Sequence, residues 1–150
     1  MKNADLSIRA FDEVTDLHAL SGIWLEASLL AHAFIGEKRL REQQILIEEK
    51  YLPVAETWVA CLAGAPVGFI SLLDNFIGGL FVLPNRQGRG IGRALITHAL
   101  ALKGELLLEV YTGNEQALCF YKSLGFTELS RRAADDEGQP FENASMRLIR

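Results

Sequence analysis

Three glycines within five residues, Gly88, Gly90 and Gly92, mark the segment of this sequence best suited to bind an anion. Glycine has no Cβ and adopts positive φ angles, so a ligand can approach its backbone N–H groups closely. The apolar run before these glycines predicts a strand, and apolar residues at helical spacing after them predict a helix. The first N–H groups of a helix lack internal partners, and the helix dipole attracts negative charge there. Residues 87–93 therefore form a candidate anion-binding loop.

The charge distribution supports an anionic ligand. Residues 75–104 contain no acid and four basic side chains, whereas the other residues hold 11 basic and 19 acidic groups. A tight turn with solvated arginines is the alternative explanation for a lone Gly-x-Gly, but the flanking strand, the helix and this asymmetry favour a ligand. A Walker loop is excluded because no Lys-Ser or Lys-Thr pair follows the glycines. A dinucleotide fingerprint is excluded because Arg93 stands where its third glycine would be.

Length and composition exclude several classes of protein. With 150 residues, 49% of them hydrophobic and 23% charged, the chain is expected to form a single soluble domain over residues 1–150. Its formal net charge of −4 argues against binding to nucleic acid. No segment is apolar enough for export or for crossing a bilayer, so we expect a cytoplasmic protein. Cys61 and Cys119 show no metal-ligand spacing, and no metal site is expected.

The periodicity of the sequence predicts helices and strands that place the glycine loop between a strand and a helix. Two helices are expected early in the chain, at residues 12–30 and again before Pro53. A strand over 76–83, a helix over 91–103 and a strand over 106–111 form the one clear βαβ crossover. A further helix is expected over residues 115–124. The remaining strands are expected at residues 6–11, 57–62, 67–73, 126–130 and 146–149.

Two segments resemble signatures of the GNAT superfamily of acyl-CoA N-acyltransferases. Residues 87–92 resemble its Q/R-x-x-G-x-G/A pyrophosphate loop, and residues 114–126 resemble its second signature at the expected distance. Residues 24–35 and 135–146 resemble a subgroup of small bacterial members that includes protein-lysine acetyltransferases. The resemblance implies an α/β (α+β) fold with a mixed, mostly antiparallel twisted sheet. Six to seven strands would be flanked by about four helices, with one central βαβ crossover.

The resemblance also implies acetyl-CoA as cosubstrate and a set of residues that bind it. In the family, loop amides bind the pyrophosphate and the preceding strand pairs with the pantetheine arm. A backbone N–H near Phe81 or Val82 would face the acetyl carbonyl. The positions that match the family's cofactor contacts are Leu80, Phe81, Val82, Gln87, Gly88, Arg89, Gly90, Ile91, Gly92, Arg93, Asn114 and Tyr121.

Tyr121 matches the position of the family's general acid. Its hydroxyl, with an ordinary pKa of about 10, can donate a proton to a departing thiolate, whose thiol has an ordinary pKa of about 8.5. Packing of Tyr121 as part of the aromatic core is the structural alternative. Many relatives carry a glutamate on the strand before the loop, where this chain has only Asp74, at the turn. The general base therefore stays open between His32, Glu109 and a chain of water molecules.

We expect an acetyl-CoA-dependent N-acetyltransferase, acting by direct attack of a primary amine in a ternary complex. A non-catalytic CoA-binding sensor or regulatory protein is the alternative, and the intact loop, Asn114 and Tyr121 weigh against it. The acceptor is an amine on a small molecule or a protein, either a lysine or an N-terminus. The sequence does not choose among these acceptors, nor between a monomer and a homodimer.

Overall fold

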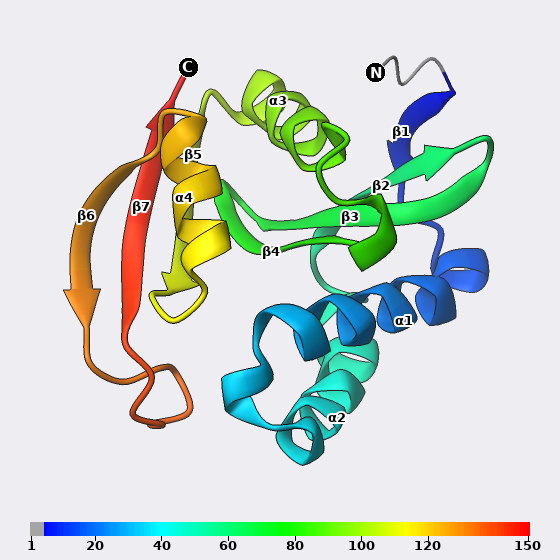
Figure 1. The fold of residues 1–150 in the computed structure, drawn as a ribbon. Coiled ribbons are helices and arrows are strands. Elements are labelled where there is room, and N and C mark those ends of the chain that lie inside the picture. Colours follow the sequence, from blue (N-terminus) through cyan, green and yellow to red (C-terminus); the bar gives the residue numbers. More distant parts are fainter. Residues whose placement is uncertain (1–4) are drawn as a thin grey trace.

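A computed structural model describes residues 5–150 of the chain (Figure 1). Within these residues, seven strands form one sheet in the order β1-β2-β3-β4-β5-β7-β6. The strands are β1 (Leu6–Ala10), β2 (Glu56–Leu62), β3 (Ala65–Leu73), β4 (Phe76–Val82), β5 (Glu105–Tyr111), β6 (Thr127–Arg132) and β7 (Asn143–Ile149). All neighbouring pairs are antiparallel except β4 and β5, which are parallel. This confirms the predicted mixed, mostly antiparallel sheet and its central crossover.

In the described part of the chain, residues 5–150, four α-helices cover the two faces of the sheet. They are α1 (Glu13–Ala31), α2 (Glu37–Leu46), α3 (Ile91–Lys103) and α4 (Glu115–Ser123), joined by the short turns η1 (Ala33–Ile35), η2 (Ile47–Tyr51, a π-helical turn) and η3 (Pro84–Arg86). In Figure 1, α1 and α2 lie on the opposite side of the sheet from α3. The helices agree with the predicted ones, except that the second changes to π geometry at Ile47.

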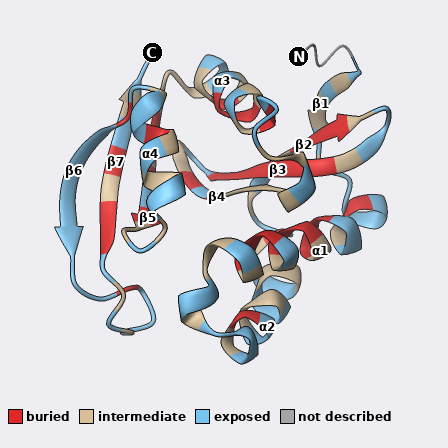
Figure 2. Cartoon of the chain, viewed as in Figure 1, coloured by how far each residue is buried: buried red, intermediate tan, exposed pale blue. Residues whose placement is uncertain are grey.

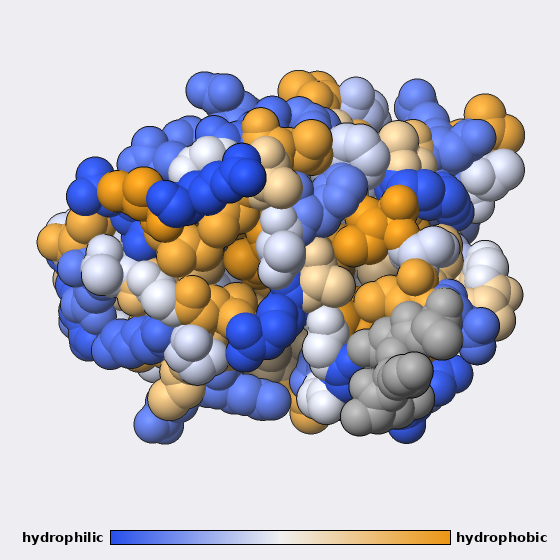
Figure 3. Space-filling view, turned by 90° about the horizontal axis from the view of Figure 1, so that it is seen from above, coloured by the Kyte–Doolittle hydropathy of each residue, from blue (hydrophilic) through white to orange (hydrophobic). Residues whose placement is uncertain are grey.

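Each face of the sheet carries its own hydrophobic core (Figure 2). Leu20 and Trp24 of α1 pack with Phe69 of β3, whereas Ile91 and Leu95 of α3 belong to the other core. Alternation along the strands supplies both cores, since successive side chains point to opposite faces. On the face seen in Figure 3, hydrophobic groups emerge in separate clusters between hydrophilic ones. Within residues 5–150, no helix is long and apolar enough to cross a membrane.

An ion pair between Arg9 and the buried carboxylate of Asp16 fixes the start of α1 against β1. The Asp16 carboxylate is 1% exposed and accepts hydrogen bonds from Arg9 Nη1 and Nη2 at 2.7 and 2.8 Å. It also accepts one from the Asp12 backbone N–H at 2.8 Å. Asp12 in turn caps the helix by accepting from the N–H of Val14. The guanidinium of Arg9 holds the pKa of Asp16 below its ordinary value.

Two strands of the sheet separate in a way that creates space for a ligand. The parallel strands β4 and β5 pair only at Phe76 with Leu107 and at Ile77 with Leu108. Beyond Ile77, β4 remains paired with β3 as far as Val82 but has no register partner on β5. The divergence begins beside a β-bulge, where the register with β3 skips Gly78. The unpaired edge of β4 therefore faces an opening between the two strands.

Candidate active site

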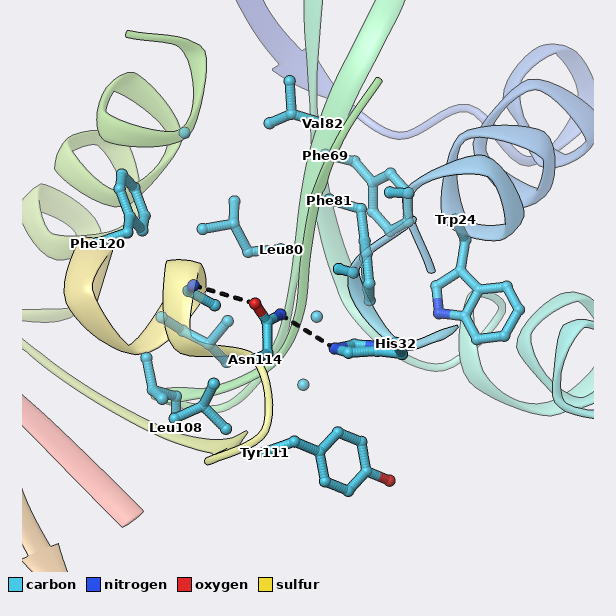
Figure 4. Close-up of a pocket in the computed structure, with 18 of the residues that line it drawn as sticks. Trp24, His32, Phe69, Leu80, Phe81, Val82, Leu108, Tyr111, Asn114 and Phe120 are labelled. Atoms are coloured by element: carbon cyan, nitrogen blue, oxygen red, sulfur yellow. Dashed lines mark hydrogen bonds between the residues drawn. The ribbon is translucent and has the colours of Figure 1, made fainter. Parts of the chain in front are cut away.

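A cavity of about 970 Å³ occupies the opening between β4 and β5. Its walls come from α1, η2, β4, β5, α4 and the glycine loop, and Figure 4 shows residues that line it. Eleven of the twelve predicted cofactor contacts line this cavity; Arg89 does not. The three candidate catalytic residues, His32, Glu109 and Tyr121, line it as well. The structure thus brings the predicted site together from segments that are far apart in the sequence.

The glycine loop has the backbone geometry expected of an anion site. Gly88 and Gly90 adopt φ angles of +78° and +81°, a region that side chains with a Cβ rarely enter. Gly90 begins α3 without a side-chain cap, and the first turn of α3 contains no acidic residue. The first N–H groups of α3 and the helix dipole therefore favour an anion at this end of the cavity. Gln87 anchors the loop, because its Nε2 donates to the Val82 carbonyl at 3.1 Å.

Side chains at the end of β4 line the cavity and alternate between the two hydrophobic cores. Phe81 packs against Trp24 of α1, with ring centroids 6.2 Å apart, and against Phe69 at 5.6 Å. Leu80 and Val82 belong to the opposite side of the strand (Figure 4). The backbone of this unpaired segment can therefore hydrogen-bond a ligand while Phe81 holds the strand in place. Together with the loop, this edge fits the pyrophosphate and pantetheine parts of acetyl-CoA.

Asn114 and His32 meet across the cavity (Figure 4). Asn114 Oδ1 accepts the backbone N–H of Ala117 at 3.1 Å and caps α4. Its Nδ2 consequently faces His32 Nε2 at 3.3 Å, and since Nδ2 is a donor, Nε2 must accept. Burial lowers the pKa of His32 to about 4. His32 is therefore neutral at pH 7 with its proton on Nδ1, which makes it a weak base.

Tyr121 lies deep in the wall of the cavity. Its ring packs edge-on against Phe120 and Phe126, with centroids 5.3 and 5.4 Å apart. Burial raises the pKa of its hydroxyl above the ordinary value, so the group keeps its proton at neutral pH. Tyr121 thus belongs to the core and also lines the cavity. Its role as general acid stays a prediction.

Glu109, the other candidate base, is engaged in an ion pair. It is exposed on β5, and its Oε1 lies 2.9 Å from Arg132 Nη2. The same Nη2 lies 2.7 Å from Asp136 Oδ1. A proton accepted by Glu109 would weaken its attraction to Arg132. Both candidate bases therefore already have partners in this structure, and the choice among His32, Glu109 and a chain of water molecules stays a prediction.

Two cavity residues were missed by the sequence analysis. Tyr111 donates its hydroxyl to Asp135 Oδ2 at 3.0 Å, and Asp135 also accepts the N–H groups of Glu137 and Gln139. Tyr51 of η2 places its ring in the cavity wall. Tyr111 sits in a hydrophobic strand and Tyr51 in an irregular turn, so no local pattern distinguished either from core residues. Within residues 5–150, no group of His, Cys, Asp or Glu could hold a metal ion.

A comparison with protein families finds a match to the acetyltransferase (GNAT) domain over residues 53–128. Among curated proteins, the peptidyl-lysine N-acetyltransferase YjaB of Escherichia coli K12 is 37% identical over 123 residues, covering 81% of this chain and 83% of that protein. The solution structure of apo-form YjaB from Escherichia coli superimposes with a TM-score of 0.86 at 34% identity, covering 95% and 96% of the two chains.

A more distant structure has the same fold: yncA from Salmonella typhimurium with its cofactor acetyl-CoA, at a TM-score of 0.70 and 21% identity, covering 97% of this chain and 94% of that one. The family match runs from β2 to the start of β6 and so includes β4, β5, α4 and the glycine loop of the cavity, whereas α1 and η2 lie outside it. Together with the 37% identity to a curated acetyltransferase, that match shows that this chain belongs to the GNAT family and is an N-acetyltransferase that uses acetyl-CoA.

Proposed function

We propose that the acceptor is the side-chain amine of a lysine in a protein or peptide. The proposal draws first on the relative that is 37% identical and is named a peptidyl-lysine N-acetyltransferase. It draws also on a second hollow of about 250 Å³, which shares Gly78, Glu109 and Tyr111 with the main cavity. A long, slender side chain can enter this hollow while the glycine loop holds acetyl-CoA at the other end.

The charge of the second hollow carries this proposal. Four carboxylates line it, from Glu109, Asp135, Asp136 and Glu137, against one cation, Arg132. Arg39 compensates Glu137 from outside the hollow. The surplus of negative charge favours a protonated amine over a neutral or anionic acceptor. A lysine side chain combines the required positive charge with a narrow, flexible stem.

The residues around the cavity have different roles in the reaction. Acetyl-CoA supplies a thioester, whose acyl carbon joins the amine nitrogen while its bond to sulfur breaks. The amides at the start of α3 hold the pyrophosphate, and an N–H near Phe81 or Val82 stabilises charge on the carbonyl oxygen. Tyr121 donates its hydroxyl proton to the departing sulfur and is reprotonated from solvent, while the nitrogen that has joined the acyl carbon releases its surplus proton to solvent. Asn114 positions the cofactor arm, and His32 holds Asn114 in place.

The amine must lose a proton before it attacks. At pH 7 this costs about 4.6 kcal/mol for a lysine with a pKa of about 10.4, from 3.4 pH units at about 1.36 kcal/mol each. With a pKa of about 4, His32 is too weakly basic to take that proton. We propose that it leaves to solvent through the second hollow, past Glu109.

Acetyl-CoA turnover against a mixed library tests the proposal. The library contains lysine peptides with blocked N-termini, peptides with free N-termini and no lysine, and polyamines, and mass spectrometry identifies each product. Acetylation of the blocked lysine peptides is the expected result. Exclusive modification of free N-termini or polyamines would refute the lysine assignment. CoA binding without turnover of any amine would favour the non-catalytic alternative.

The Tyr121→Phe variant tests the general acid in the same assay. It keeps the ring and its packing but removes the proton donor. We expect a kcat lowered by roughly 10²-fold or more, the usual contribution of a general acid, with unchanged affinity for CoA. A variant with the wild-type kcat would remove Tyr121 from the mechanism.

A further inference from the structure

The hydroxyl of Tyr51 occupies the space that a side chain at position 78 would fill. A Cβ built on Gly78 would lie 1.5 Å from Tyr51 Oη and 2.6 Å from its Cζ. No residue other than glycine can therefore stand at position 78 while Tyr51 keeps its place. The phenol, which comes from η2, thus reaches β4 at the bulge where this strand leaves β5.

The same hydroxyl is buried without a hydrogen bond. Among residues 5–150, no group partners Tyr51 Oη, although its ring lines the main cavity. Burying a hydroxyl without a partner is unfavourable, and such groups in native proteins are rare. Burial also raises the pKa of Tyr51 to about 12, so the group is a neutral phenol at physiological pH. A fixed, unsatisfied polar group in a cavity wall is poised to hydrogen-bond a ligand.

The location of this hydroxyl connects it to the entering amine. Gly78 lines both the main cavity and the second hollow, and Tyr51, which lines the main cavity, holds its hydroxyl against Gly78. The neighbouring polar groups at this junction are already engaged, since Tyr111 donates to Asp135 and Glu109 pairs with Arg132. On β4 itself there is no polar side chain.

We propose that the Tyr51 hydroxyl binds the acceptor amine, accepting a hydrogen bond from its N–H and so orienting the nitrogen lone pair toward the thioester. The inference rests on the proposed function and adds a substrate-binding residue to it. Tyr51 takes no proton in this scheme. Gly78 is part of the same arrangement, because it leaves room for the phenol at the bulge.

The Tyr51→Phe variant tests this inference, because it removes only the hydroxyl. With a blocked lysine peptide we expect kcat/KM for the peptide to fall by about tenfold, the usual effect of losing one hydrogen bond to a charged or reacting group. The Kd of CoA, measured by calorimetry, should not change. The urea midpoint of the free protein should stay the same or rise, since an unsatisfied buried hydroxyl is gone.

Tyr111→Phe is the matched control for stability. Its hydroxyl has a partner in Asp135, so the urea midpoint of this variant should fall. Gly78→Ala should displace the Tyr51 phenol and lower kcat/KM as well, by a steric route.

Wild-type kcat/KM in Tyr51→Phe would overturn the inference and leave the proposed function standing. A lowered urea midpoint with unchanged kinetics would show that the hydroxyl is structural, which also overturns the inference. Absence of turnover of any amine by the wild-type protein would instead refute the proposed function, and this inference with it.

Discussion

His32 is expected to make the protein lose stability in acid. In the folded chain its Nε2 accepts a hydrogen bond from Asn114, and burial lowers its pKa to about 4 from an ordinary 6.5. A lowered pKa means that the unfolded chain binds the proton more tightly. The stabilisation is therefore complete above about pH 6.5 and is lost as the pH falls toward 4. The difference of about 2.5 pKa units corresponds to about 3 kcal/mol at 1.36 kcal/mol per unit.

Urea unfolding of the wild type and of His32→Gln at pH 7.5 and pH 4 measures this loss. Glutamine offers an oxygen to Asn114 in place of Nε2 and does not titrate. The wild type should lose about 3 kcal/mol more than the variant between the two pH values. His18→Gln is the control, because it removes an exposed histidine from α1, the helix that ends just before His32, and leaves the contact with Asn114 intact. Carboxylates titrate in all three proteins, so their effect cancels in the comparison.

An equal loss of stability in wild type and His32→Gln would refute the reasoning. It would mean that the folded and unfolded chains bind the His32 proton equally, despite the burial of the ring. An NMR titration of the His32 imidazole then measures its pKa in the folded protein. A pKa near 7 in the folded protein would restore His32 as a candidate base, whereas a pKa near 4 excludes it at physiological pH.

Three further predictions concern the rate, the cofactor and the fold. First, kcat/KM for a lysine peptide should rise about tenfold per pH unit between pH 6 and 9, as the neutral amine becomes available; a break near pH 6.5 would point to a histidine base. Second, Gly90→Ala should weaken CoA binding about tenfold in calorimetry, because its φ of +81° costs other residues about 1 to 2 kcal/mol. An unchanged Kd would mean that the loop does not hold the pyrophosphate. Third, Asp16→Asn should lower the free energy of unfolding by about 2 to 3 kcal/mol, because it breaks the charge-assisted hydrogen bonds from Arg9. A smaller loss of unfolding free energy in urea titrations would show that water replaces the hydrogen bonds between Arg9 and Asp16.

The cofactor side of the site was predictable because its signals are local. Gly88 and Gly90 are needed for their own backbone angles, and the helix that follows them has a clear amphipathic period. The second signature places Asn114 at the start of α4 for an equally local reason, since its side chain caps that helix. These features depend on residues a few positions apart, which a sequence pattern can represent.

Strand ends were less predictable, because pairing rather than composition determines them. The last strand was expected from Met146, but β7 begins at Asn143. Its first residues are mostly small or polar and have little intrinsic preference for a strand. They extend the sheet because β7 lies between β5 and β6 and is hydrogen-bonded on both sides, with Asn143 opposite Tyr111 and Arg132. Such tertiary pairing overrides local propensity.

The acceptor side could not be predicted because it is built from side-chain pairs that only the fold brings together. Tyr51 meets Gly78, and Tyr111 meets Asp135. Each pair joins different elements, so neither member has a pattern of its own. The cofactor side relies on backbone groups, which most substitutions elsewhere leave unchanged. We therefore expect substitutions in these proposed acceptor pairs to alter the choice of amine while the glycine loop continues to hold acetyl-CoA.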